Sequence, residues 1–278
     1  MPLVSGHIRY DVSGELTAIE GDLVPMLAGL PSSPVQLCAA AQALVILPGL
    51  ASDLGVGASR AGEKHIRAAS GILRALAALD DRPVDQPRPL TDRVVGTCRH
   101  FAVLSCAFLR HRGIAARARC GFASYFVPGS FVDHWIVEYR HPVDERWVRV
   151  DPEILGFEFV GAPHDLAAGE FVSGGEAWTL CRAGAADPSR FGVDGVPHAW
   201  GIAEVRGNAI RDLAALNKVE MLPWDAWGRM MASYDGDTGP DYDRLLDTVA
   251  GTCASNDVEA IERLYGAEDL AVPGSMLN

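Results

Sequence analysis

Apolar side chains recur about once per helical turn in the segment 97–112. Phe101 and Leu104 mark this apolar face, which predicts a helix with one side in the protein core. Thr97 is a residue type that caps helix N-termini, and Gly113 fits the position just after a last helical turn. The signals at both ends of the segment therefore support the predicted helix.

Other segments carry helical or strand patterns. Helices are predicted over 34–47, 61–79, 170–181, 203–216, 224–231, 242–249 and 257–264. Strands are predicted over 115–125, 132–139 and 147–150, whereas 7–19 is predicted as a strand or an irregular entry and the proline-rich stretch 80–89 as a loop. In this order, helices come first, a helix with antiparallel strands follows, and more helices come last. Such an order is typical of the α+β class.

The chain length of 278 residues allows one large domain or two small ones. We expect a single domain over 1–278, divided into a helical N-terminal part (1–90), a catalytic core (91–155) and a helical C-terminal extension (156–278). The most apolar stretch, 37–54, is interrupted by Gln42, Pro48 and Asp53, so it predicts a buried helix and no membrane span.

Composition narrows the classes of function. Apolar residues make up 49% and charged residues 22%, which is an ordinary globular balance, and the net charge of −12 argues against a general nucleic-acid binder. The six cysteines are scattered with no C-x-x-C pair, so no metal site is expected. Polar residues near the N-terminus replace the apolar core that a signal peptide needs, and we expect reduced thiols in a cytoplasm.

A cysteine, a histidine and an aspartate stand out because each falls on a predicted element. Cys98 begins the 97–112 helix, where free N–H groups and the helix dipole favour a thiolate. His134 lies inside a predicted strand, and Asp151 ends the next one. Adjacent antiparallel strands could set the imidazole beside the carboxylate, which is the arrangement of a nucleophilic acyl-transfer site.

Three blocks resemble, in the same order, the catalytic segments of bacterial transglutaminase-like proteins. They are Gly96-Thr97-Cys98-Arg99-His100-Phe101, Asp133-His134-Trp135-Ile136-Val137-Glu138 and Arg146-Trp147-Val148-Arg149-Val150-Asp151-Pro152. The resemblance covers about residues 93–153. It implies a papain-like or transglutaminase-like α+β core, in which a central helix carrying Cys98 packs on an antiparallel sheet carrying His134 and Asp151, with extra N- and C-terminal helices. It also implies Cys98 as the nucleophile, His134 as base and acid, and Asp151 as the orienting group, with no cofactor.

Further residues are candidates for the oxyanion hole and for substrate binding. The backbone N–H of Cys98 is one expected oxyanion donor, and the side chain of Gln86 is the candidate for the second. The candidates for substrate binding are Arg99, Trp135, Trp178, Asp212, Asn217 and Trp224. The polar series around Asn208, Arg211 and Asp212 could instead be a buried network that ties helices together.

The reaction itself stays open at this point. The first hypothesis is cysteine-dependent acyl transfer or hydrolysis at an amide-like bond through a thioester, on a peptide, protein or small-molecule amide. The superfamily also contains peptidases, amidases and glycopeptide deglycosylases. A tailoring enzyme of small-molecule biosynthesis and a non-catalytic scaffold that kept the fold are further alternatives. We expect no nucleic-acid or membrane partner, and the oligomeric state is open.

Overall fold

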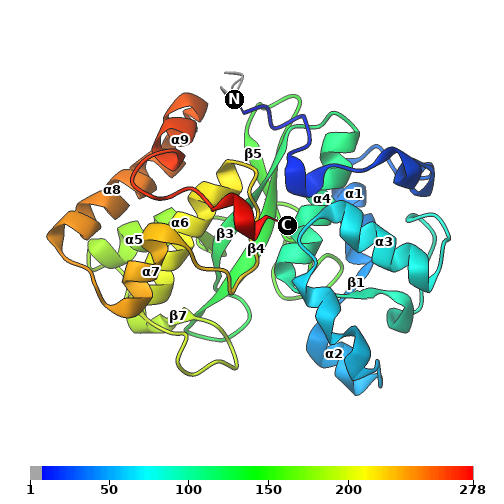
Figure 1. Ribbon diagram of the computed structural model, residues 1–278, viewed down its shortest axis with the longest axis horizontal. Helices are drawn as coiled ribbons and strands as arrows, with labels where there is room; N and C mark the ends of the chain where they lie inside the picture. The colour runs from blue at the N-terminus through cyan, green and yellow to red at the C-terminus, as the bar shows by residue number, and fades with distance from the viewer. Residues whose placement is uncertain (1–7, 278) are drawn as a thin grey trace. The chain divides into compact units, whose positions relative to one another are not determined.

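The computed structural model describes residues 8–277, which form two compact units (Figure 1). The cysteine unit, named for Cys98, comprises Tyr10–Ala118 and Trp135–Ala167. The histidine unit, named for His134, comprises, of the described residues, Arg119–His134, 168–277 and 8–9. The predicted division into a helical part, a core and an extension stays a prediction.

Helices of the cysteine unit gather around α4 (Cys98–His111). They are α1 (Pro34–Gln42), α2 (Pro48–Asp53) and α3 (Ala69–Leu79), with the 3₁₀ helices Glu15–Thr17, Gly21–Leu27, Ala58–His65 and Leu90–Asp92. Both α1 and α3 pack against α4. Because every residue of α4 from Arg99 to Arg110 is buried, this helix is the centre of the unit's core.

Two short parallel strands lead into α4. Strand β1 (Val45–Ile46) pairs with β2 (Val94–Val95), and Thr97 follows as the N-cap of α4. Gly96 has to be glycine, since a Cβ there would lie 2.7 Å from Cγ of His100. The close approach lets the backbone N–H of Thr97 donate to Nδ1 of His100 at 3.1 Å. The entry of the helix is thus fixed by residues on both sides of Cys98.

The larger sheet has the strand order β5-β4-β3-β6, and β7 pairs with β4. Its strands are β3 (Ala116–Ala123), β4 (Phe131–Arg140), β5 (Trp147–Val150), β6 (Phe171–Ser173) and β7 (Phe191–Gly192). Strands β3 and β4 each contribute residues to both units. In the cysteine unit β4 and β5 are antiparallel with Val137 opposite Val150, and in the histidine unit β3 and β6 are antiparallel with Phe122 opposite Val172.

Helices of the histidine unit pack around α6 (Ile202–Leu216), as Figure 1 shows. The others are α5 (Gly174–Arg182), α7 (Gly228–Asp235), α8 (Pro240–Ser255) and α9 (Val258–Tyr265), with the 3₁₀ helices Pro188–Arg190 and Gly274–Met276. All four pack against α6, whose residues from Gly207 to Leu216 are buried. This helix is therefore the centre of the core of the histidine unit, as α4 is in the cysteine unit.

The mixture of helices with a mainly antiparallel sheet confirms the predicted α+β class. Four predicted helices are wrong in part. The first ends at Gln42 because β1 follows, and the segment 61–79 is a 3₁₀ helix up to His65 and an α-helix only from Ala69. The helix predicted from residue 170 begins at Gly174 after strand β6, and the one predicted over 224–231 begins at Gly228. No strand forms in the described part of 7–19, and His7 lies outside the described residues.

Gly174 supplies a stability prediction, because a Cβ there would overlap the backbone of Asn208 in α6. Since backbone cannot move aside cheaply, we expect Gly174→Ala to cost about 2 kcal/mol or more of unfolding free energy. Gly251→Ala is the matched control: it lies inside α8 with nothing within 4 Å of its ideal Cβ, and alanine should stabilise it by about 0.5–1 kcal/mol. Urea denaturation of both variants measures the difference, and equal effects would contradict the packing described here.

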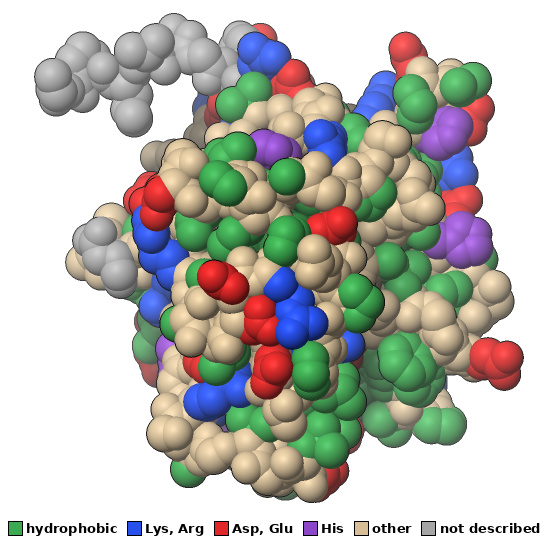
Figure 2. All heavy atoms as spheres, turned by 90° about the vertical axis from the view of Figure 1, so that its right-hand side faces the viewer, with side chains coloured by type: hydrophobic (Ala, Val, Ile, Leu, Met, Phe, Trp, Pro, Cys, Tyr) green, Lys and Arg blue, Asp and Glu red, His purple; other side chains and the backbone are tan. Residues whose placement is uncertain are grey.

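On the face in Figure 2, acidic and basic side chains lie beside one another and hydrophobic ones are scattered among them. Within residues 8–277, no helix has both the length and the apolar character that crossing a bilayer would require.

Candidate functional site

Cys98 is the first residue of α4 and is partly exposed. At this position the side chain lies next to the N–H groups that have no partner inside the helix. Those groups and the helix dipole favour negative charge, so a thiolate is stabilised at the start of α4. The placement that the sequence predicts for Cys98 is confirmed.

The other five thiols lie in different surroundings. Cys38, Cys106, Cys120 and Cys253 are buried. Burial raises the pKa of Cys38 to about 12, and it raises the pKa of the partly exposed Cys181 to about 11. A thiol with so high a pKa is almost fully protonated at neutral pH, so these groups are poor nucleophiles.

Asp151 follows β5 directly and is fully buried. Its Oδ1 accepts a hydrogen bond from the backbone N–H of Glu153 at 2.9 Å, which is an Asx turn. Its own N–H donates to the carbonyl of Pro163 at 2.9 Å and so closes a loop over residues 151–163. Gln42 anchors the same loop, because its Nε2 donates to the carbonyls of Glu153 and Leu155 at 2.9 and 2.8 Å. The carboxylate is therefore rigidly mounted.

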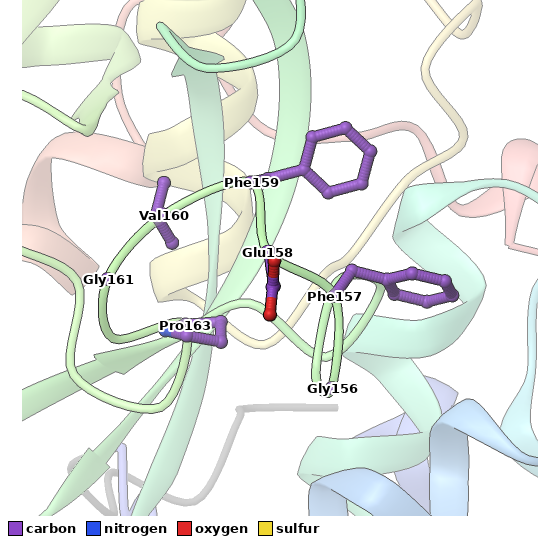
Figure 3. A pocket seen from close by; sticks show the side chains of 7 residues that line it. All are labelled: Gly156, Phe157, Glu158, Phe159, Val160, Gly161 and Pro163. Carbon is purple, nitrogen blue, oxygen red and sulfur yellow. The ribbon is translucent and has the colours of Figure 1, made fainter.

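The loop that begins at Asp151 encloses a surface hollow of about 570 Å³. Figure 3 shows Val160, Glu158 and Pro163 inside the curve of the loop, while the rings of Phe157 and Phe159 project on its other side. Both rings are about half exposed. Aromatic surface of this kind directly after Asp151 was not predicted from the sequence.

His134 lies on β4, with its side chain almost fully buried. The rings of Tyr125 and Phe126 meet the imidazole edge-on, at centroid distances of 6.3 and 5.0 Å. Within the cysteine unit, Glu138 of β4 lies in a buried ion pair. Glu138 pairs across the sheet with Arg149, which lies two residues before Asp151.

Asp133 projects from the opposite face of β4 and belongs to a buried polar network. Asn208 of α6 donates from Nδ2 to Oδ1 of Asp133 at 2.6 Å and to the carbonyl of Gly121 at 3.3 Å. The Oδ1 of Asn208 accepts from Nη1 of Arg211 and from the thiol of Cys120. Four partners therefore hold one amide side chain between α6 and the sheet.

The acidic groups of this network have raised pKa values. Burial raises the pKa of Asp133, while Arg211, Asn208 and His134 act to lower it. Burial also raises the pKa of Glu204, although Arg211 acts to lower it and Tyr234 donates to its Oε2 at 3.2 Å. The positive charge of Arg211 thus acts on the pKa values of both carboxyl groups.

The residues predicted to bind substrate lie in varied surroundings. Within the cysteine unit Arg99 and Trp135 are fully buried, and Arg99 donates to the carbonyl of Ile66 at 3.3 Å. Gln86 lies on an exposed turn that lines a hollow of about 440 Å³ beside α1. The structure describes no hydrogen bond of Gln86 with the start of α4, and its role as an oxyanion donor stays a prediction.

The remaining predicted residues lie in the histidine unit. Trp178 is buried and donates from Nε1 to Asp247 at 2.8 Å, and Asp212 is buried against Arg119. Asn217 caps the end of α6 by donating to the carbonyl of Leu213, whereas Trp224 is 45% exposed. Of these four side chains, only Trp224 has a large exposed surface, so their roles in substrate binding stay predictions.

Sequence reasoning did not assign a role to Asp133, Tyr125, Phe126 or Gln42. Asp133 stands directly before His134, but the partner that gives it a role, Asn208, lies 75 residues further on. The polar series around Asn208 was recognised, and its interpretation as a buried network is the one that the hydrogen bonds of Asn208, Arg211 and Asp212 support.

Residues 60–152 match the family model of the transglutaminase-like superfamily. This range includes Cys98, His134 and Asp151 and confirms the resemblance seen in the three sequence blocks. A solved structure from Cytophaga hutchinsonii, provisionally named a cysteine protease, is 18% identical with a TM-score of 0.21. That similarity covers 58% of this chain and 48% of the other protein, so the chain spans about half of its length. No protein in a search of the curated proteins matches this chain.

Proposed function

Because residues 60–152 are a transglutaminase-like region, we propose that the protein is an enzyme that cleaves an amide-like bond through a thioester on Cys98. In the proposed reaction the thiolate attacks the carbonyl carbon, and the C–N bond breaks as His134 gives a proton to the departing amine. Water or a second amine then attacks the thioester, and the thiolate leaves again. The products are an acid, or a new amide, and the released amine.

Asp151 is proposed to hold the imidazole of His134 in one orientation and to stabilise its protonated form. The rigid mount of Asp151 supports this role, since its turn and loop contacts fix the carboxylate at the end of β5. The backbone N–H of Cys98 is proposed as one oxyanion donor, because the first N–H groups of α4 have no partner inside the helix.

The observation that carries the proposal is the contrast among the six thiols. Cys98 is at a helix start within the matched family region and is partly exposed, whereas Cys38 and Cys181 have raised pKa values and the other three are buried. None of the six, all of which lie within residues 8–277, forms a disulfide. Reduced thiols are typical of a cytoplasm, and we propose that compartment.

Alkylation by iodoacetamide at pH 6 tests the proposal, with the label located by peptide mass spectrometry. At this pH an ordinary thiol is almost fully protonated, so we expect Cys98 to react at least about tenfold faster than any other cysteine. The preference should disappear in His134→Ala, because the thiolate loses its counter-charge. Slow and equal labelling of the exposed thiols in the wild-type protein would refute the proposal.

A further inference from the structure

Glu153 is a carboxylate close to the proposed nucleophile, and the proposed reaction gives it no role. One of its carboxylate oxygens lies within 4.8 Å of Sγ of Cys98. Both residues belong to the cysteine unit, so this distance is a property of one compact part of the chain. The side chain of Glu153 is partly exposed, as that of Cys98 is. A substrate that reaches the sulfur therefore also meets this carboxylate.

The backbone of Glu153 is fixed on both sides of its side chain. Its N–H donates to Oδ1 of Asp151 at 2.9 Å, and its carbonyl accepts a hydrogen bond from Nε2 of Gln42 at 2.9 Å. The neighbouring residues Pro152 and Ile154 are buried. Gln42 is the last residue of α1, which packs against α4. These contacts tie the turn that carries Glu153 to the helix that carries the nucleophile.

The charges of the proposed reaction leave a negative group at this place. The thiolate of Cys98 and the carboxylate of Glu153 have the same sign, and a positive group in contact with both offsets their repulsion. Once the proposed thioester has formed, the sulfur has no charge and His134 has given its proton to the departing amine. Glu153 then remains as a negative charge beside the acyl group. The surroundings of Sγ therefore favour an acyl group that carries a positive charge.

Covalent geometry gives the position of that positive charge. In a thioester, an atom bonded to the carbon next to the carbonyl is three bonds from the sulfur, which corresponds to about 3–4 Å. A charged N–H donor at that place lies about 2.7–2.9 Å from the carboxylate oxygen that it bonds. Together these two lengths span the separation between Sγ of Cys98 and the Glu153 oxygen, which is within 4.8 Å. An ammonium group on the carbon next to the carbonyl therefore fits between them.

Resting on the function proposed above, we propose that Glu153 determines substrate specificity by binding the ammonium group of an α-aminoacyl donor whose amide bond Cys98 attacks. The ammonium group donates to the carboxylate, and this contact places the carbonyl carbon against Sγ. Glu153 forms no covalent bond and transfers no proton. Acyl groups that are neutral at this position bind less well, and anionic ones are repelled.

The test compares two activated esters of nearly equal size, glycine p-nitrophenyl ester and p-nitrophenyl propionate. At pH 6 the glycyl ester carries an ammonium group where the propionyl ester has a methyl group. Acylation of Cys98 releases p-nitrophenol, whose appearance gives the rate, and peptide mass spectrometry locates the adduct. EDTA is present in every reaction, because a thiolate and a carboxylate this close also suit Zn²⁺.

The ratio of the glycyl rate to the propionyl rate is the quantity to be measured, because a change in the reactivity of the thiol affects both esters alike. For the wild-type protein we expect a ratio at least about tenfold above that of the free thiol 2-mercaptoethanol. Glu153→Gln keeps the shape of the side chain and removes its charge, so it should lower the ratio about tenfold.

Glu158→Gln is the matched control. Glu158 lies further along the same loop, and its side chain is exposed (Figure 3). This variant removes the same charge from the protein and should keep the wild-type ratio within about twofold, because exposed charges are screened. An equal fall of the ratio in both variants would be an effect of net charge and would contradict the local role of Glu153.

The possible failures can be told apart. If neither ester leaves an adduct on Cys98 of the wild-type protein, the proposed function and this inference are both overturned. If both esters acylate Cys98 but the wild-type ratio equals that of 2-mercaptoethanol, only the proposed specificity is overturned, and this outcome needs no variant. A folded Glu153→Gln protein that keeps the full wild-type ratio would likewise contradict the role of the carboxylate.

Discussion

Replacement of Cys98 by alanine is expected to abolish acylation of the protein by an activated ester such as p-nitrophenyl acetate. In the proposed mechanism the sulfur is the only atom of the protein that bonds to the acyl carbon, so no other side chain can substitute for it. Removal of a catalytic nucleophile lowers rates by factors of about 10³ or more. Intact-mass spectrometry should show one acetyl adduct on the wild-type protein and none on Cys98→Ala.

Cys181→Ala is the matched control for this experiment. Cys181 is also partly exposed, but burial raises its pKa to about 11, so its thiol should contribute nothing at neutral pH. The control should acylate at the wild-type rate. An adduct of unchanged yield on Cys98→Ala would place the nucleophile elsewhere and contradict the mechanism.

The second large effect concerns stability. Arg119 and Asp212 form a bidentate ion pair at 2.9 and 2.7 Å, with side chains 5% and 0% exposed. Asp212→Leu would leave the guanidinium buried without its carboxylate, and it would also remove the acceptor of the Cys120 N–H. We expect a loss of about 3–5 kcal/mol in the free energy of unfolding, measured by urea denaturation.

The double variant Arg119→Leu/Asp212→Leu should recover much of this loss, because it removes the buried guanidinium together with its carboxylate partner. Arg146 and Asp165 are the exposed comparison, with an ion pair at 2.6 Å and side chains 49% and 40% exposed. Asp165→Asn should cost less than about 1 kcal/mol. If Asp212→Leu were as mild as Asp165→Asn, the buried pair would not hold α6 to the sheet.

Local signals explain which elements were predictable. The α4 helix was predicted because a cap, an apolar face and a closing glycine agree, and Gly113 has the positive φ of 70° that such an end requires. Strand β6 was missed because three residues are too few to show a period, although the Ser173-to-Glu176 capping box marks the true start of α5. Elements marked by signals within a few residues of one another could be predicted from the sequence. A strand that forms by pairing with a distant strand could not.

The same division holds for the site. Cys98, His134 and Asp151 were identified from their positions in predicted elements. Cys98 begins a helix, His134 lies inside a strand, and Asp151 ends the next strand. Asp133 was quoted only as the neighbour of His134, because its partner lies on a helix far along the chain. Conversely, the polar residue Asp212 was named as a substrate candidate, while the structure describes it as the buried partner of Arg119. A single sequence does not show which polar residues are in contact in the folded protein.

In the proposed function, Cys98 is a thiolate paired with a protonated His134 at and below neutral pH. The rate constant for alkylation of Cys98, measured from pH 4 to pH 10, tests it most directly. The claim predicts a rate that is already high and nearly level between about pH 5 and pH 7, and that loses this plateau in His134→Ala. A single rise centred near the ordinary thiol pKa of about 8.5, identical in both proteins, would contradict it.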